Sequence, residues 1–156
     1  MRAVRRKDRE KSREFALAVV DKCDYAVMAT VNPDGSPYCV PLSMAREGDW
    51  LFFHCALEGH KIDNLRFNNR VCVTCVGDVK LIPGAFGTEY KSAVINGTAE
   101  EITGKEEKTQ ALRVITKHYA PDDMPGFDVY IQEKLNRTGV WKIRINEISG
   151  KGRLSS

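Results

Sequence analysis

The sequence predicts an α+β domain, mainly β, in which antiparallel strands form a barrel. Two observations lead to this prediction. Short apolar runs with strand-like composition follow one another through tight turns, without a helix after each strand. Apolar residues at helical spacing are confined to one leading segment and to segments inserted later in the chain. We therefore expect about six strands, an N-terminal helix and inserted helices.

Length and composition suit a single domain. The chain has 156 residues, of which 42% are hydrophobic. We expect this domain to span residues 1–156, with a frayed start at 1–8 and a tail at 152–156. The net charge is only +3, and its basic and acidic residues are interspersed, which argues against a nucleic-acid partner. No apolar run approaches the ~20 residues of a membrane span, so we expect no membrane association.

The cysteines indicate a reducing compartment. There are five, an odd number without disulfide spacing: Cys23, Cys39, Cys55, Cys72 and Cys75. We therefore expect a cytoplasmic protein. Cys72 and Cys75 have the spacing of a metal-binding pair, but residues three apart in a strand point to opposite faces. No second pair or histidine cluster completes a zinc set, and we expect no metal site.

The chain begins with a predicted amphipathic helix over residues 8–23. Phe15, Val19 and Cys23 recur every fourth residue, with charged residues on the opposite side. The next segment, residues 25–31, is apolar or small on both faces. This composition predicts a strand that is covered on both sides.

A proline-containing strand follows the turn Asn32-Pro33-Asp34-Gly35. Pro37 and Pro41 cannot donate to a sheet ladder, so residues 37–45 must form an irregular strand or an edge strand. Such an interruption leaves backbone groups free for a ligand, at Val40, Leu42 and Ser43. An ordinary β-bulge would explain the same pattern.

Residues 51–70 combine a strand, a turn and a helix start. The strand over 50–55 ends in His54 and Cys55, and Gly59-His60-Lys61 then opens a helix. Backbone N–H groups at a helix start favour an anion, Lys61 adds a positive charge, and Gly59 permits close approach. The alternative is a surface helix with a solvated basic start.

The second half alternates strands with helices in the same way. A bend is expected at Gly97, because glycine inside a strand weakens it. The predicted segments are a strand at 71–76, a loop at 77–87, a strand at 88–102, helices at 105–119 and 127–135, and a final strand at 139–148.

Several segments stand in a characteristic order: ATVNPDGSPYCVPLSM, WLFFHCALEGHK, NNRVCVTCVG, TEYKSAVINGTAEEI and VWKIRINEISGK. This ordered set covers nearly the whole chain. It resembles the FMN-binding split barrels related to pyridoxamine 5'-phosphate oxidase, and their nitroimidazole-resistance branch most of all. The resemblance implies a split antiparallel barrel, bound FMN, and a homodimer with the cofactor in clefts between subunits.

The resemblance also assigns cofactor roles by position. One strand would meet the isoalloxazine through its backbone, at Val40, Pro41, Leu42 and Ser43. The next strand would line the flavin and its ribityl chain, with His54 and Cys55. The following turn would bind the phosphate, with Gly59, His60 and Lys61. A later segment would approach the cofactor, with Tyr90, Lys91 and Ser92. A C-terminal pair would reach it from the partner chain, namely Trp141 and Lys151.

Two departures from the family pattern bear on function. The chain ends KIRINEISGKGRLSS, without the arginine-rich C-terminal substrate motif that contains a histidine. Pyridoxamine phosphate is therefore not the expected substrate. His60-Lys61 stands in place of an Arg-Lys pair, which weakens bidentate phosphate recognition but retains positive charge.

The resemblance implies an FMN-dependent oxidoreductase as the leading hypothesis. Electrons would pass from NADH or NADPH to a small aromatic or nitro-type acceptor, with His54 as proton donor or hydrogen-bond partner. One alternative is a non-catalytic protein that binds or carries FMN. Another is a haem-binding split barrel with His54, His60 or His118 as axial ligand. Cys55 is interpreted as an apolar filler, because adjacent strand residues face opposite ways and His54 cannot activate it.

Overall fold

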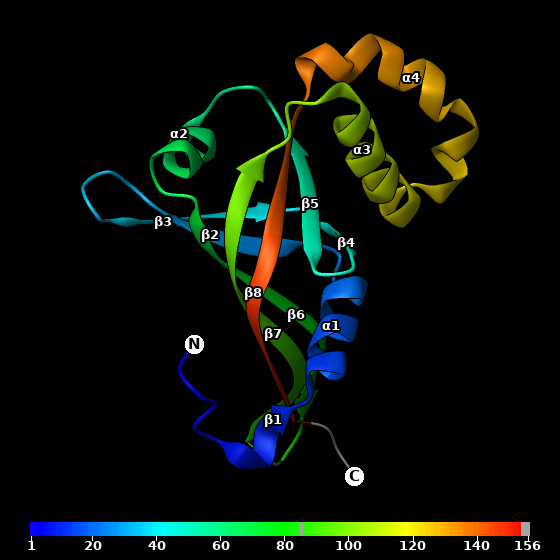
Figure 1. Ribbon diagram of the computed structural model, residues 1–156. Helices are drawn as coiled ribbons and strands as arrows, with labels where there is room; N and C mark the ends of the chain where they lie inside the picture. Colours follow the sequence, from blue (N-terminus) through cyan, green and yellow to red (C-terminus); the bar gives the residue numbers. More distant parts are fainter. Residues whose placement is uncertain (85, 154–156) are drawn as a thin grey trace.

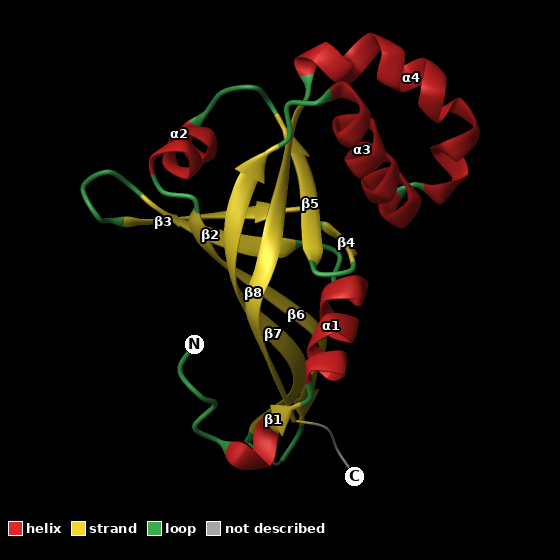
Figure 2. Ribbon diagram, in the orientation of Figure 1, coloured by secondary structure: helices red, strands yellow, loops and turns green. Residues whose placement is uncertain are grey.

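A curved antiparallel sheet forms most of the protein, and helices pack around it (Figures 1 and 2). The computed structural model describes residues 1–84 and 86–153. The strands are β1 (Glu10–Lys11), β2 (Ala26–Val31), β3 (Pro37–Leu42), β4 (Ala45–Glu47), β5 (Trp50–Cys55), β6 (Arg70–Ile82), β7 (Gly87–Glu101) and β8 (Gly139–Arg153). The helices are α1 (Arg13–Lys22), α2 (His60–Phe67), α3 (Lys105–Tyr119) and α4 (Phe127–Lys134). The prediction of a mainly antiparallel α+β fold is confirmed.

The sheet is a barrel that is open along one line. Its strand order is β3-β2-β6-β7-β8-β5-β4, and β1 pairs with β8. The two end strands, β3 and β4, are nevertheless neighbours in sequence, joined by Ser43 and Met44. Three Cα–Cα steps span at most about 11 Å, so the sheet must curl until its two edges lie close together. The opening between β3 and β4 makes this a split barrel.

Strand β3 is an edge strand, as its prolines predict. Among the described strands it pairs with β2 alone, with Pro41 opposite Val27. The bond from the Asn32 N–H to the Ser36 carbonyl, at 2.9 Å, closes the hairpin. Ladder bonds recur at every second residue from there, so Pro37 and Pro41 are among the residues whose backbone faces away from β2. No ladder bond is lost at either proline.

The barrel interior holds the larger of two hydrophobic clusters, and α1 covers one end of it (Figure 1). Ala16, Val19 and Val20 of α1 are buried in this cluster. The helix is shorter than the predicted 8–23, because the Ser12 hydroxyl accepts the Phe15 N–H at 3.2 Å and caps it there. Residues 7–11 instead form a 3-10 turn and β1.

The second cluster lies outside the barrel, between β5, β8 and the helices α3 and α4. Leu112 and Ile115 of α3 pack there with Phe127 and Ile131 of α4. The Tyr119 hydroxyl donates to the Met44 carbonyl at 3.0 Å and ties the end of α3 to the β3–β4 connection. The helices predicted at 105–119 and 127–135 are both present, and their bounds agree with the prediction to within one residue.

The β6–β7 hairpin is longer than predicted. Within the loop expected at 77–87, residues 77–82 belong to β6, which continues through a register shift between Gly77 and Lys80; residue 85 lies outside the described residues. The bend predicted at Gly97 is confirmed by a register shift between Asn96 and Gly97. A Cβ at residue 97 would lie 2.5 Å from Ile143 Cγ2, so the close approach of β8 requires glycine there.

The outer face of β2 also differs from prediction. Val27 is 38% exposed and Tyr25, just before the strand, is 60% exposed, although both faces of residues 25–31 were expected to be covered. Met28 on the inner face is fully buried. One side of this strand is thus covered by the chain's own core, and the other is not.

The two ends of the chain meet along β8. The Met1 ammonium pairs with Glu147, and β1 pairs with residues 150 and 151. Strand β8 extends to Arg153, so Gly152 and Arg153 belong to the sheet rather than to the expected tail. The rest of that tail, residues 154–156, lies outside the described residues. No described helix combines the length and apolar character that crossing a membrane requires.

Candidate functional site

Strand β5 presents two different surfaces at the end that carries His54 and Cys55. Leu51 and Phe53 are buried in the barrel cluster, whereas Phe52 packs on the cluster beneath α3 and α4. Because side chains alternate along a strand, His54 lies on the α3 side. Cys55 packs against the barrel cluster, and burial raises the pKa of its thiol. Cys55 is therefore a protonated, apolar neighbour and not a thiolate.

The start of α2 has the properties of an anion site. Gly59 precedes it with a φ of 130°, a left-handed conformation that favours glycine. The first backbone bonds of the helix run from the Ile62 and Asp63 N–H groups to the Gly59 carbonyl, at 2.8 and 3.1 Å. No acceptor within the described chain bonds the N–H groups of His60 and Lys61. Two donors at the positive end of the helix dipole thus remain available.

Lys61 adds a charge to this helix start. Its side chain is half-buried, and no carboxylate of the described residues lies within ion-pair distance of it. Lys61 is close enough to Cys55 to oppose the burial effect on the thiol pKa, so it lies near the end of β5. A phosphate group fits these donors, because an unpaired lysine and free helix N–H groups favour a dianion.

His60 is held by the β2–β3 turn. Its Nε2 donates to the Asn32 Oδ1 at 2.6 Å, and its ring lies 4.0 Å from the Tyr38 ring, centroid to centroid. The buried Asn64 amide also donates to Asn32 Oδ1, at 2.8 Å, and to Thr30 Oγ1, at 3.0 Å. These contacts fix the position of α2 on the sheet. The His60 side chain thus anchors the helix, and it is the His60 backbone N–H that is free to meet a ligand.

The sequence interpretation did not include this anchoring group. Asn64 falls four residues after His60 on the same helix face, which is the one sequence signal that could have pointed to it. Asn32 had been interpreted only as a turn residue. The long-range pairing of a turn with a helix 28 residues later depends on the packing of α2 on β2.

Residues 40–43 lie at the split of the barrel. The ladder register turns the backbone of Val40 and Leu42 towards β2, and both side chains pack on the barrel cluster. This corrects the expectation that their own N–H and C=O groups are free. The carbonyl of Pro41 faces the open edge instead, and Ser43 is exposed where β3 ends.

Trp141 and Lys151 lie far apart on β8. Trp141 pairs with Phe53 near the His54 end of β5, is 3% exposed, and its Nε1 finds no acceptor among the described residues. Lys151 lies ten residues further along, or roughly 33 Å of strand. There it pairs with Ser92, whose hydroxyl donates to the Lys151 carbonyl at 3.2 Å.

Tyr90 lies beside Lys151 at the end of the barrel opposite to Trp141, which we call the lower end. The Lys151 ammonium lies 5.9 Å from the Tyr90 ring centroid. Desolvation raises the pKa of the Tyr90 hydroxyl, but hydrogen bonds from Arg9 and Lys151 outweigh it, and the pKa is lowered. One chain thus brings together an upper group around His54, Lys61 and Trp141 and a separate lower group around Tyr90.

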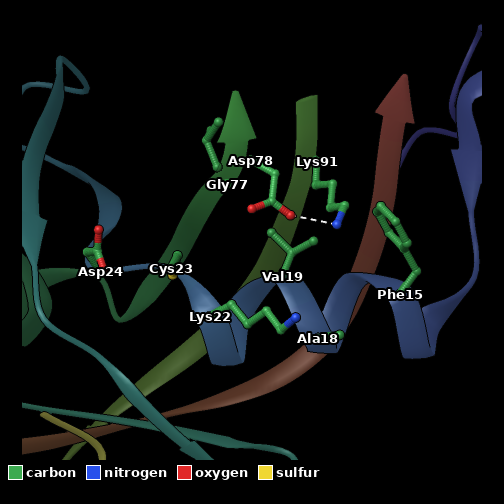
Figure 3. Close-up of a pocket in the computed structure, with 10 residues that line it drawn as sticks. Phe15, Ala18, Val19, Lys22, Cys23, Asp24, Gly77, Asp78 and Lys91 are labelled. Atoms are coloured by element: carbon green, nitrogen blue, oxygen red, sulfur yellow. Dashed lines mark ion pairs between the residues drawn. The ribbon is translucent and has the colours of Figure 1, made fainter. Parts of the chain in front are cut away.

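Lys91 lines a small cavity between α1 and the β6–β7 hairpin. Figure 3 shows its ammonium pointing to Asp78, with an Nζ–Oδ2 distance of 2.5 Å. The cavity has a volume of about 230 Å³, and Phe15 and Val19 of α1 form its apolar side. Because its lysine is paired and its volume is below the usual range for cofactor pockets of about 300 to 1,000 Å³, this cavity is a poor candidate for a nucleotide.

A larger cavity opens beside His54. It lies between α3, α4 and the end of β5, with a volume of about 590 Å³. Leu112 and Ile115 of α3 and Phe127 of α4 contribute apolar walls. The His54 side chain is exposed at the edge of this cavity, and partial desolvation there lowers the pKa of its imidazole, so the neutral form predominates at pH 7. The sequence could not indicate this cavity, because it lies between helices and a strand end that only the packing of the chain brings together.

His118 and the pair Cys72 and Cys75 lie outside the lining of these two cavities. His118 is exposed and stacks edge-on against Tyr119, at 4.5 Å between centroids. Cys75 is buried while Cys72 is half-buried on the opposite face, as strand alternation predicts. In the part of the chain that is described, no three His, Cys, Asp or Glu side chains cluster as metal ligands.

Known proteins resemble this chain in sequence and in fold. The family model for pyridoxamine 5'-phosphate oxidase matches residues 12–152. A candidate 5-nitroimidazole antibiotic resistance protein from Bacteroides thetaiotaomicron shares 28% identity, with 91% of this chain and 84% of that chain covered and a TM-score of 0.77. No curated protein matches the sequence significantly.

Two flavin-binding proteins show the same fold at lower identity. A FAD-binding protein from Mesorhizobium loti is 22% identical, with 94% of this chain and 98% of that chain covered and a TM-score of 0.70. A FAD- and haem-binding protein from Mycobacterium smegmatis is 23% identical, with 94% and 74% covered and a TM-score of 0.82. The family match spans nearly the whole chain, from the cap of α1 to the end of β8. The chain belongs to the pyridoxamine 5'-phosphate oxidase family.

Proposed function

We propose that this protein is an FMN-dependent oxidoreductase that reduces a small aromatic or nitro-type acceptor. The observation that carries the proposal is the unpaired Lys61 at the open start of α2, beside the end of β5. Its charge and the free N–H groups of His60 and Lys61 suit the terminal phosphate of a flavin mononucleotide. The family match and a FAD-binding relative support a flavin, and the single phosphate-sized site at the start of α2 is our reason for proposing FMN.

The remaining upper residues would position the rest of the cofactor. The carbonyl at Pro41 and the exposed Ser43 offer polar groups at the barrel split, and Cys55 offers an apolar contact. Bound FMN would supply the redox chemistry, accepting electrons from NADH or NADPH and passing them to the acceptor. The protein's own task is to hold the flavin and acceptor together and to exclude water.

His54 is the residue that we propose acts on the acceptor. Its lowered pKa keeps the ring neutral at pH 7, so it can donate a hydrogen bond from one nitrogen and accept at the other. As a proton donor it would have to be charged first. The rate would then fall as pH rises through the His54 pKa, which lies below the usual 6.5.

The purified protein is expected to show a flavin absorption spectrum, and stopped-flow mixing with NADH or NADPH is expected to bleach it. The His54→Gln variant should retain FMN but reduce nitrobenzene derivatives at least about tenfold more slowly. If His54 is a general acid, the rate should fall by about 10²- to 10⁴-fold, and if it only donates a hydrogen bond, the rate should fall by less than that. His118→Gln is the matched control, because His118 is exposed away from the cavity.

Three outcomes separate the rival functions. A bound flavin that neither nicotinamide reduces would indicate an FMN carrier. A Soret band would indicate haem, with His54 as the available axial ligand, because His60 is bonded to Asn32 and His118 stacks on Tyr119. A colourless protein that takes up no added FMN would overturn the proposal.

We also propose that the protein is a homodimer in the cytoplasm, with each FMN between subunits. The roughly 33 Å of strand between Trp141 and Lys151 supports this arrangement, because the upper and lower groups of one chain cannot meet at one mononucleotide. The uncovered outer face of β2 and β6 supports it as well. Tyr25, Val27 and Val76 are 60%, 38% and 52% exposed there and line one shallow hollow.

Val76→Glu is expected to convert the dimer into a monomer, because a charge would be buried against the apolar face of the second copy. Light scattering after size exclusion measures the mass. Val129→Glu serves as the control, since Val129 is 69% exposed on α4 and distant from that hollow in sequence and fold. A wild-type protein that elutes as a monomer at micromolar concentration would refute the dimer.

A further inference from the structure

The cavity between α3 and α4 opens to solvent, because residues at its margin such as Asp122, Asp123 and Tyr130 are exposed. Its volume of about 590 Å³ falls within the range of about 300 to 1,000 Å³ that small-molecule sites occupy. The walls are apolar where the helices face each other, with Leu112 and Ile115 on one side and Phe127 and Ile131 on the other.

One histidine and three charged side chains line the cavity beside its apolar walls. His54 contributes its neutral imidazole from the end of β5. Asp122 and Asp123 come from the 3-10 helix Pro121–Gly126 that joins α3 to α4, and Lys134 from the end of α4. None of these three charged side chains forms an ion pair within the described residues. Two carboxylates against one ammonium give the rim a net negative charge.

The cavity is separate from the proposed phosphate site. Lys61 does not line it, and His54 lies on the face of β5 opposite to Cys55, which Lys61 approaches. A ligand between α3 and α4 could therefore reach His54 without displacing a nucleotide phosphate from the start of α2.

We infer that this cavity binds the acceptor, and that the acceptor is an uncharged or cationic aromatic molecule of one or two rings. The inference deepens the proposed function, on which its redox part rests. The apolar walls accept a flat ring, His54 hydrogen-bonds to a polar substituent where the end of β5 meets the cavity, and the acidic rim disfavours an anionic substituent. Aromatic carboxylates are thereby excluded as good substrates.

The test uses three nitroaromatic probes that differ in charge: 4-nitrobenzylamine, 4-nitrobenzyl alcohol and 4-nitrobenzoate. Calorimetric titration into the protein as purified should give comparable or tighter binding for the amine than for the alcohol, and about tenfold weaker binding for the benzoate. The double substitution Asp122→Asn and Asp123→Asn should reduce the difference in binding affinity between the amine and the benzoate to about threefold or less.

A second variant tests the location. Ile115→Trp places a larger ring in the cavity and should weaken binding of the alcohol at least about tenfold, while FMN content stays unchanged. Val129→Trp, on the exposed side of α4, is the matched control. Circular dichroism checks that both variants fold. If Ile115→Trp does not fold, the double substitution Asp122→Asn and Asp123→Asn still tests the same site.

The outcomes distinguish the two proposals. Probe binding that Ile115→Trp leaves unchanged, or equal affinity for all three probes, would overturn the cavity inference even if the flavin is active. Probe binding that follows the expected charge order in a protein that takes up no FMN would overturn the proposed redox function and retain the cavity as a binding site.

Discussion

Replacing Lys61 with alanine is expected to weaken FMN binding by about 10- to 150-fold, because a hydrogen bond to a charged group contributes about 1.5 to 3 kcal/mol. The lysine has no ion pair among the described residues, so its ammonium is free to meet a phosphate. The variant also leaves the N–H groups at the start of α2 in place, which is why binding should weaken rather than disappear. Flavin fluorescence on titration with the apoprotein measures the affinity.

Two controls make this result specific. Lys117→Ala removes an exposed lysine of α3 and should leave FMN affinity unchanged. Riboflavin, which lacks the phosphate, should bind the wild-type protein and Lys61→Ala equally. An FMN affinity that Lys61→Ala does not alter would assign Lys61 to the solvated surface and move the phosphate elsewhere.

Replacing Phe53 with alanine is expected to lower the free energy of unfolding by about 3 to 5 kcal/mol, as for other buried aromatic truncations. Phe53 is fully buried in the barrel cluster, opposite Trp141 on β8. A loss of this size is a large fraction of the total stability of about 5 to 15 kcal/mol of a typical domain. Urea denaturation followed by tryptophan fluorescence measures it.

Phe86→Ala is the matched control, because Phe86 is fully exposed. Its unfolding free energy should lie within about 0.5 kcal/mol of wild type. A Phe53→Ala protein as stable as this control would mean that the β5–β8 pairing does not form the core of the domain.

The sequence predicted the elements that depend on local pattern. The prolines at 37 and 41 identified an edge strand, and Gly97 identified a bend, because each residue constrains its own backbone. The Gly59-His60-Lys61 start of α2 was found for the same reason. Such features need no knowledge of what lies across the fold.

The missed features depend on pairing between distant segments. Residues 77–82 look like part of a loop, yet β7 supplies a partner that draws them into a strand through a bulge. The bonds from His60 and Asn64 to Asn32 depend on where α2 settles. For the same reason the sequence could not show that Trp141 and Lys151 lie at opposite ends of one strand.

The prolines of β3 also decide what can occupy the opening of the barrel. An exposed edge with free N–H groups is a template onto which another β-strand can add, and this is a route to aggregation. Pro37 and Pro41 present no donors there, so an incoming strand would meet an incomplete ladder. Carbonyl acceptors remain. The split is thus protected against polymerisation while it stays accessible to a small molecule with donors of its own.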